Sequence, residues 1–186
     1  EMLRESGVDL RTVAEIQKDV DRLKLVSDRF GKIGSKPVLE QKDLNGQVRN
    51  MMEYIQRRAP GKVQFALHTP DGAEPLIARI SSPLFDWVIE NLLKNALDAM
   101  EGRGAITVSI VELVKEIVID VTDTGKGIAP RNLQKVFKPG FTTKKRGWGL
   151  GLSLSKRIIE QYHKGQLFVR QSEIGKGTTF RIILLK

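Results

Sequence analysis

The sequence predicts an α+β fold: a two-layer sandwich with helices on one face of a mixed, largely antiparallel sheet, preceded by a long coiled-coil-like helix. Three observations support this prediction. Helical and alternating segments follow one another in mixed order after residue 37, as in two-layer folds. Residues 82–100 repeat apolar side chains at helical spacing, and alternating strand patterns follow them. Before residue 34, apolar residues recur every three or four positions along a narrow seam.

The N-terminal segment is expected to form a separate helical domain over residues 1–36. Its seam consists of Val13, Ile16, Val20, Leu23, Val26, Phe30 and Ile33. Asp9 is a suitable N-cap, and residues 1–6 are expected to end a preceding helix. A helix that packs on its own domain is the alternative, but so narrow a seam on a charged helix favours a bundle partner. Gly31 to Pro37 breaks the pattern, so the second domain is expected over residues 37–186.

Within the second domain, hydrophobic periodicity predicts helices and strands in alternation. We expect helices over residues 45–58, 82–100 and 150–162, and strands over 63–67, 77–80, 106–114, 116–121, 166–170 and 178–185. Ser82 is the expected N-cap of the second helix, with Pro83 as its first residue. Residues 125–147 are rich in Gly, Pro and Lys and are expected to be irregular.

Composition excludes several classes of function. The chain has 186 residues and no cysteine, so disulfide scaffolds and thiolate metal sites are excluded. No apolar run approaches the roughly 18 residues that span a bilayer, and the first residues lack the apolar stretch of a signal peptide. The formal net charge of +9 makes nucleic-acid binding a candidate function. The basic residues are spread among acids, however, so phosphates of a small ligand or an acidic protein partner are favoured and no nucleic acid is expected.

A polar stripe on the helix 82–100 is the first candidate site. At 100° per residue, Asn91, Lys94, Asn95 and Asp98 fall on one face. The stripe could simply be the solvated face of an amphipathic helix. Asparagine is a poor helix former, however, and a solvated face is normally filled by Glu, Lys or Gln. An asparagine carbonyl suits Mg²⁺ whose other ligands are phosphates and water.

An acidic residue at the end of a strand is the second candidate. Asp123 continues the parity of Ile117, Ile119 and Val121, so its carboxylate projects from a core-facing row. Such a carboxylate is costly unless a group donates hydrogen bonds to it. It could cap the following turn, or it could accept from the exocyclic amine of a purine. Two glycines soon after it, at 125 and 127, would let a ring lie close to the backbone.

The third candidate is the segment from Phe137 to Ser153, which leads threonines and basic residues into spaced glycines and then a helix. Backbone N–H groups at a helix start bind phosphate, and a hinged segment suits a closing lid. The P-loop spacing and the dinucleotide fingerprint are both absent.

Together these segments resemble the motifs of the Bergerat-fold ATPases, the superfamily of histidine kinases, gyrase, heat-shock chaperones and MutL. Residues 91–99 resemble the N box, 123–127 the G1 box and 137–144 the F box. Residues 147–151 resemble the G2 box, and 175–180 the final box before the last strand. The F box and the short lid are similar to those of sensor histidine kinases.

This resemblance implies that the cofactors are ATP and Mg²⁺. Asn95 is implied as the Mg²⁺ ligand, with Asn91 at the phosphates, Asp123 on the adenine amine and Lys144 on the γ-phosphate. Trp148 stands where the family usually has threonine or glycine. The implied nucleotide-binding set is Asn91, Lys94, Asn95, Asp98, Asp123, Gly125, Gly127, Ile128, Phe137, Thr142, Thr143, Lys144, Gly147, Trp148, Gly149, Leu150, Gly151, Leu152 and Thr178.

Residues 15–44 resemble the second helix of a kinase dimerisation stem and its linker. The resemblance implies a homodimer formed through that stem and phosphoryl transfer to a stem histidine upstream of this chain, with relay to a response regulator receiver domain. Neither His68 nor His163 resembles a phosphoacceptor, so the chain alone is expected not to phosphorylate itself. The implied location is cytoplasmic, in a protein anchored in the bacterial inner membrane. An ATPase of the gyrase, chaperone or MutL class and a nucleotide-sensing pseudokinase module are the alternatives.

Overall fold

A five-stranded sheet forms the centre of the computed structural model, which describes residues 37–69, 75–144 and 147–186. The predicted helical seam and its N-cap lie outside the described residues. The order across the sheet is β2 (Lys62–His68), β4 (Arg103–Glu112), β5 (Glu116–Asp123), β7 (Gly177–Leu185) and β6 (Gln166–Glu173). The pair β2–β4 is parallel and the other three pairs are antiparallel. The predicted mixed, largely antiparallel sheet is therefore confirmed.

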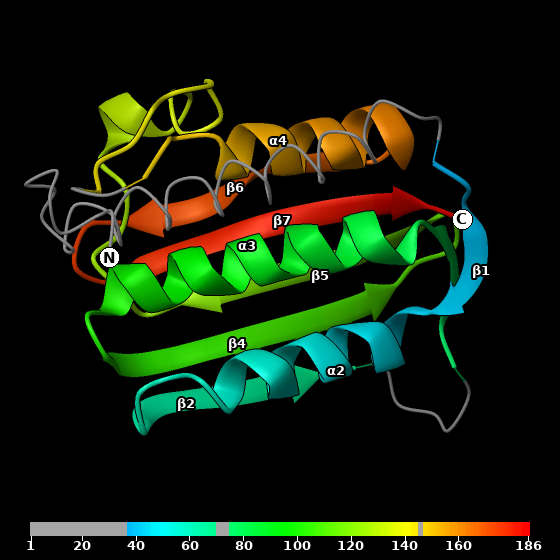
Figure 1. Ribbon diagram of the computed structural model, residues 1–186, viewed down its shortest axis with the longest axis horizontal. Helices are drawn as coiled ribbons and strands as arrows, with labels where there is room; N and C mark the ends of the chain where they lie inside the picture. The colour runs from blue at the N-terminus through cyan, green and yellow to red at the C-terminus, as the bar shows by residue number, and fades with distance from the viewer. Residues whose placement is uncertain (1–36, 70–74, 145–146) are drawn as a thin grey trace, which may run out of the picture. The chain divides into compact units, whose positions relative to one another are not determined.

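Three helices cover one face of this sheet, as predicted (Figure 1). They are α2 (Leu44–Gln56), α3 (Ser82–Met100) and α4 (Gly151–Arg157), which continues into a π-helical turn, η2 (Ile158–Tyr162). A short 3₁₀ turn, η1 (Pro130–Asn132), interrupts the segment that the sequence predicts to be irregular. These elements lie in one compact unit, Val38–Lys186.

A second, two-stranded sheet stands beside the helices and was only half predicted. It pairs β1 (Glu40–Asp43) with β3 (Ile77–Ile80) in antiparallel register. The β3 strand lies at its predicted bounds. The β1 strand was missed because its sequence, Glu-Gln-Lys-Asp, has no apolar alternation.

The core lies between α3 and the strands beneath it. Ile117, Ile119 and Val121 of β5 are at most 1% exposed, and Phe85 and Leu92 of α3 are fully buried. The two-residue period of β5 and the helical period of α3 therefore aim apolar side chains at each other. Asp123 shares the core-facing parity of β5, as predicted.

The start of α3 differs by one residue from the prediction. Its N-cap is Ser81 rather than Ser82, and Pro83 stands at the second helical position. The Ser81 side chain makes no capping bond; instead its backbone N–H donates to Nε2 of His163 at 3.1 Å. The helix ends at Met100, and its C-cap is Glu101, whose φ of 52° is left-handed. Proline is compatible with either position because both precede the first intrahelical N–H bond.

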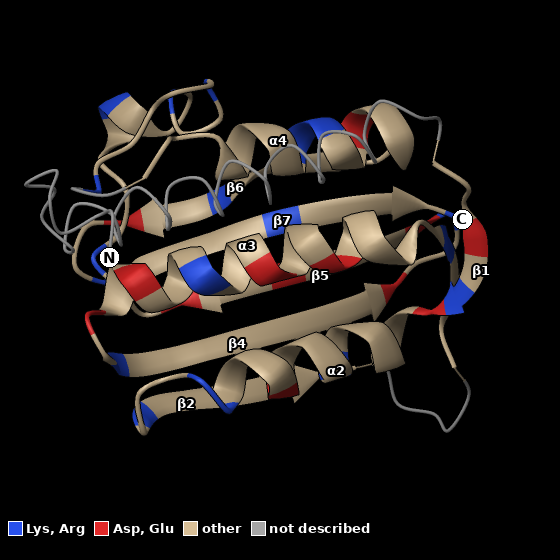
Figure 2. Cartoon of the chain, viewed as in Figure 1, with Lys and Arg blue, Asp and Glu red and all other residues tan. Residues whose placement is uncertain are grey.

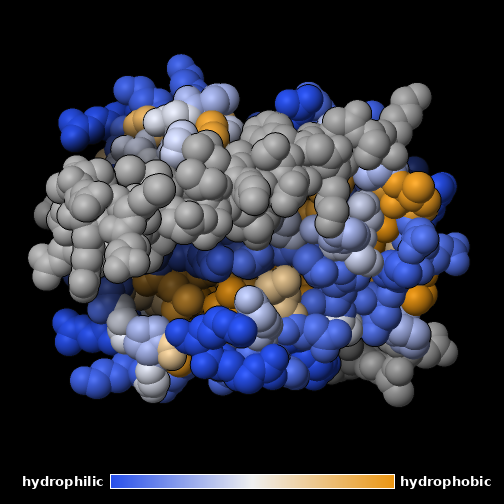
Figure 3. Space-filling view, in the orientation of Figure 1, coloured by the Kyte–Doolittle hydropathy of each residue, from blue (hydrophilic) through white to orange (hydrophobic). Residues whose placement is uncertain are grey.

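On this face of the molecule, charged side chains are scattered over several elements, whereas apolar side chains show in separate patches. Along α3 three acidic residues accompany one lysine, and the basic residues are scattered over the neighbouring described elements, so the positive charge is not gathered on one of them (Figure 2). Hydrophobic colour shows in the hollow where α3, β4 and α2 adjoin and in further patches toward the right edge of the view (Figure 3). No helix among the described residues is long and apolar enough to cross a membrane.

Candidate functional site

Two adjoining cavities open beside the second half of α3, with volumes of about 270 Å³ and about 150 Å³. Their walls come from α3, the loop after β5, residues 129–144 and 147–149, the start of α4, and β7. Both are lined by Asn95, Val136, Phe141, Thr143, Lys144 and Leu152. The site therefore combines segments that are up to 85 residues apart in the chain, from Asn95 to Phe180.

The buried carboxylate of Asp123, which is 4% exposed, lines the larger cavity. Its Oδ1 accepts the backbone N–H of Gly125 at 2.8 Å. Desolvation raises the pKa of Asp123 above its ordinary value, and it outweighs the backbone hydrogen bonds from Gly125 and Thr178. A carboxylate kept at this cost on a cavity wall is a strong acceptor for a ligand that carries an N–H donor.

The two glycines after Asp123 are required because neighbouring backbone segments of the same domain lie too close for a side chain. A Cβ on Gly125 would lie 2.7 Å from the backbone of Ala99 in α3, and one on Gly127 would lie 2.1 Å from the carbonyl of Glu173. Gly127 also has a φ of +72°. Contact of these glycines with a bound ring stays a prediction, because their conformation is already required by α3 and the β6–β7 hairpin.

A short hydroxyl network lies next to Asp123, whose partner in the β5–β7 register is Thr178. The N–H of Ile128 donates to Ser172 Oγ at 2.8 Å, and that oxygen lies 2.9 Å from Oγ1 of Thr178. Both Ile128 and Thr178 line the cavity. Ser172 was not predicted; only its position opposite Thr178 in the β6–β7 register indicates this role.

The predicted polar stripe on α3 divides into three environments. Asn95 and Asp98 face the cavities, and both accept from the ammonium of Lys144, at 2.7 Å and 2.6 Å. Asn91 instead donates to the buried hydroxyl of Ser155 in α4, at 2.9 Å. Lys94 pairs with Glu90 at 2.5 Å on the exposed side of the helix.

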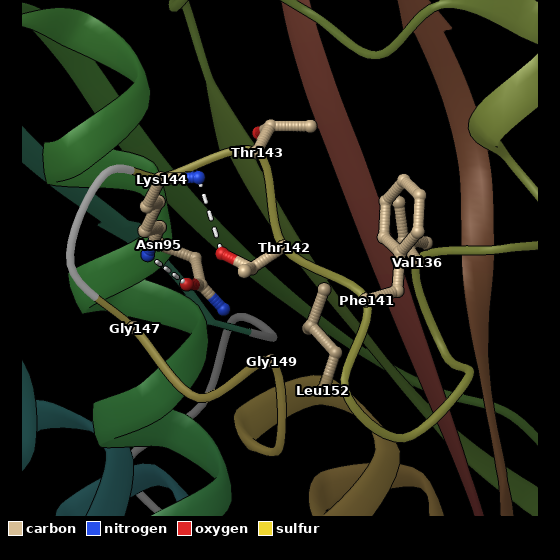
Figure 4. A pocket seen from close by; sticks show the side chains of 9 residues that line it. All are labelled: Asn95, Val136, Phe141, Thr142, Thr143, Lys144, Gly147, Gly149 and Leu152. Carbon is tan, nitrogen blue, oxygen red and sulfur yellow. Dashed lines mark hydrogen bonds between the residues drawn. The ribbon is translucent and has the colours of Figure 1, made fainter.

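The segment between η1 and α4 folds back on itself beside α3. Gly140 donates to the carbonyl of Gly149 at 3.0 Å, and a Cβ on Gly149 would lie 2.4 Å from the Gly140 carbonyl carbon. Figure 4 shows Lys144 and Asn95 on one side of the smaller cavity and the side chains of Val136 and Phe141 on the other. The cavity thus has a cationic, polar wall and an apolar wall.

The structure brings most of the predicted residues to the two cavities. The lining includes Asn95, Asp98, Asp123, Gly127, Ile128, Thr142, Thr143, Lys144, Gly147, Gly149, Leu152 and Thr178. The other predicted residues are described but do not line either cavity: Asn91, Lys94, Gly125, Phe137, Trp148, Leu150 and Gly151.

For two of these residues, Phe137 and Trp148, the structure shows the environment of the side chain outside the cavities. Phe137 packs edge-on against Phe180 at 6.2 Å between ring centroids, with the Lys156 ammonium 5.0 Å from its ring. Trp148 is 57% exposed. Their roles toward a nucleotide stay predictions.

Sequence reasoning missed several apolar lining residues. Val136 lies in the segment predicted to be irregular, Phe141 in the segment that resembles the F box and Phe180 in the segment that resembles the final box, but none of them is in the implied nucleotide-binding set. One signal was available: Phe180 is two residues after Thr178 on β7, so both share one face of the strand.

Neither described histidine lies in an environment that would activate its ring for reaction. His163 is 6% exposed, and both of its ring nitrogens are engaged, with Ser81 N–H and the Ile158 carbonyl. Desolvation lowers its pKa, outweighing the bond to Ile158. His68 is exposed at the end of β2. Among the described residues, no group of three or more His, Cys, Asp or Glu side chains could hold a metal ion.

Comparisons with known proteins identify a family and several relatives. Residues 81–186 match the family model described as histidine kinase-, DNA gyrase B-, and HSP90-like ATPase. Sensor histidine kinase ZraS of Escherichia coli is 34% identical over 184 residues, 96% of this chain and 38% of the relative. Sporulation kinase C of Bacillus subtilis is 38% identical over 97 residues, 52% of this chain and 22% of the relative. The chain thus spans well under half the length of these curated relatives.

Solved structures show the same fold. The catalytic domain of histidine kinase ThkA aligns with a TM-score of 0.69 and 28% identity, covering 80% of this chain and 95% of that domain. Full-length ShkA in complex with AMPPNP aligns with a TM-score of 0.77 and 24% identity, over 94% of this chain and 38% of that one. ThkA in complex with response regulator TrrA aligns at 0.74 and 24%, over all of this chain and 55% of that one.

Proposed function

We propose that this chain, which belongs to the family of histidine kinase-, DNA gyrase B-, and HSP90-like ATPases, is the ATP-binding catalytic part of a sensor histidine kinase. The observation that carries the proposal is the buried Asp123 carboxylate in the lining of a cavity that Asn95 and Lys144 also line. Its relatives ZraS and ThkA are named as sensor or histidine kinases. The fold alone would not distinguish the kinase from its ATPase relatives.

The two walls of the site suggest how a nucleotide lies in it. Asp123 is the acceptor for the adenine amine, and Ile128 and Thr178 lie beside the ring. The phosphates lie toward Lys144 and the backbone of residues 149–152. ShkA, which shares the fold, is titled as a complex with the ATP analogue AMPPNP, which agrees with a nucleotide as the ligand.

Asn95 is the proposed Mg²⁺ ligand. Its amide oxygen faces a cation in the structure, the ammonium of Lys144 at 2.7 Å. The described residues hold no cluster of three metal-binding side chains, and this fits a cation whose remaining ligands are phosphate and water. When bound, Mg²⁺ supplies charge neutralisation across the phosphates during phosphoryl transfer.

In this proposal the chain positions the nucleotide, and the nucleophile is a histidine on a helical stem. The catalytic contribution of Asn95, Asp123 and Lys144 is then orientation and charge stabilisation. Steady hydrolysis is not expected, because the ATPase relatives activate water with a glutamate where this chain has Asn91. The fully assembled protein is proposed to be a stem-linked homodimer that passes phosphate to a response regulator, since ThkA is titled in complex with one. Its anchoring in the inner membrane, with this domain cytoplasmic, stays an expectation from family resemblance.

Incubation with γ-labelled ATP tests the division of labour. The chain alone should bind ATP without acquiring stable label, because His163 is buried with both nitrogens bonded and His68 lies at the end of an edge strand. A longer form of the protein that includes the upstream stem helix should become labelled on a histidine. Stoichiometric label on His68 or His163 of the isolated chain would contradict the proposal, as would rapid steady release of labelled phosphate.

A further inference from the structure

Two oxygen atoms on α3 converge on one cationic nitrogen at the border of the two cavities. The Lys144 ammonium donates to Asn95 Oδ1 at 2.7 Å and to Asp98 Oδ2 at 2.6 Å. The two acceptors are three residues apart, so they lie one helical turn from each other on the same face. A single point in space is therefore within bonding reach of both oxygens.

The donor comes from a distant part of the chain, 46 residues after Asp98. The Asp98 side chain is 56% exposed and that of Lys144 is 39% exposed, so the pair is a partly solvated contact. Partly solvated ion pairs are weak and can exchange partners at small cost. Lys144, Asn95 and Asp98 all line the larger cavity, so an exchange there directly affects a bound ligand.

We infer that Asn95 and Asp98 together form a divalent-cation position, and that the Lys144 ammonium occupies it until a metal–nucleotide complex binds. The inference rests on the proposed function and adds two residues to it: Asp98 as a second cation-facing oxygen, and Lys144 as a tethered competitor of the metal. A neutral amide oxygen and a carboxylate oxygen are both hard donors that suit Mg²⁺ directly or through its water.

The exchange has a chemical consequence for Lys144. An ammonium and a divalent cation cannot share the same two oxygens, because their charges repel at contact distance. Lys144 must leave Asn95 and Asp98 before a divalent cation can bind them. Its freed ammonium then needs a new anionic partner, and the terminal phosphate of ATP provides one. With ADP the displaced ammonium lacks that partner, so the same lysine opposes binding of the diphosphate and supports binding of the triphosphate.

The opposite effects on ADP and ATP make the inference testable by calorimetry on the 186-residue chain. ADP affinity is measured with saturating Mg²⁺ and with a chelator, and the ratio gives the enhancement by the metal. In Lys144→Met, and in Lys144→Gln as a second variant, the Mg²⁺ enhancement of ADP binding should increase about two- to tenfold, the range expected for loss of a weak competing ion pair. The affinity for Mg²⁺·ATP should fall, because the terminal phosphate loses its ammonium partner. Asp98→Asn should reduce the Mg²⁺ enhancement.

Lys138→Met is the matched control, because it removes the same charge from the same segment at an exposed position. It should leave the Mg²⁺ enhancement within about twofold of the unaltered chain, as expected for screened surface charges. The inference is overturned if neither Lys144 variant changes the enhancement, or if Lys138→Met raises it as much. Failure of the unaltered chain to bind either nucleotide would instead contradict the proposed function itself.

Discussion

At the scale of single residues, two aspartates three positions apart on β5 have opposite electrostatic situations. Asp120 is 9% exposed and accepts from Arg181 Nε and from Arg170, each at 2.7 Å. Desolvation raises its pKa, but Arg181 and Arg170 together outweigh it and leave the pKa below the ordinary value. Asp123 faces the cavity on the other side of the sheet, and desolvation leaves its pKa above the ordinary value.

These two pKa shifts affect folding stability in opposite directions as the pH changes. The lowered pKa of Asp120 contributes stability that is present above the unfolded pKa of about 3.8 and is lost as pH falls through the folded value. The raised pKa of Asp123 contributes stability that is fully present below the unfolded pKa of about 3.8 and is lost as pH rises through the folded value. At neutral pH, Asp120 therefore stabilises the fold and the charge on Asp123 opposes it.

Replacing each aspartate by alanine separates structure from function. Asp120→Ala should lower the free energy of unfolding at pH 7 by about 1–3 kcal/mol, because two guanidinium groups lose a charge-assisted partner. Asp123→Ala should leave that free energy unchanged or raise it. Urea denaturation of both variants measures the difference. A larger loss in Asp123→Ala than in Asp120→Ala would show that Asp123 is mainly a structural residue.

At the scale of elements, His163 joins the end of η2 to the start of α3. Its Nε2 accepts the Ser81 N–H at 3.1 Å, and its Nδ1 lies 3.0 Å from the Ile158 carbonyl, so the ring is neutral with its proton on Nδ1. Its ring also packs edge-on against Phe85 at 6.2 Å between centroids. A protonated ring could not accept from Ser81, which agrees with the lowered pKa that desolvation causes.

The lowered pKa of His163 predicts how stability depends on pH. The contribution of the neutral ring is fully present above the unfolded pKa of about 6.5 and is lost as pH falls toward the folded value. His163→Ala should lower the free energy of unfolding at pH 8 by about 1–3 kcal/mol, since the Ser81 N–H loses its acceptor, and should flatten the decline below pH 6.5. Thermal melts across pH 5 to 8 measure both effects. His68→Ala is the control; an equal effect there, or an unchanged pH profile in His163→Ala, would contradict this role.

Element positions were predictable from the sequence where an apolar period was long. The nineteen-residue α3 was placed correctly except for its N-cap, because its buried residues repeat over five turns. The four-residue β1 could not be predicted, since its sequence is polar and its pairing with β3 is set by the fold. Parallel pairing of β2 with β4 also has no local signal. Only the tertiary structure brings Lys62 beside Arg103 in that register.

At the scale of the whole molecule, the candidate site is formed by segments that are distant in the sequence, and no single segment predicts it. Asp123 and the α3 stripe were predictable because a carboxylate in a core-facing row and paired asparagines break ordinary patterns. The bond from Lys144 to Asp98 was not, because it depends on how residues 137–144 fold back over α3. The division of the stripe had no sequence signal either, since Lys94 and Asn95 are neighbours that face different surroundings.

Titration calorimetry with Mg²⁺·ATP tests the central claim most directly, that this cavity binds the nucleotide through Asp123. The unaltered chain and Asp120→Ala should each bind one nucleotide per chain with similar affinity. Asp123→Ala should bind about a hundredfold more weakly or not at all, because a buried charged acceptor for the adenine amine is lost. Circular dichroism should show that Asp123→Ala remains folded. Equal affinity in Asp123→Ala and the unaltered chain would contradict the account.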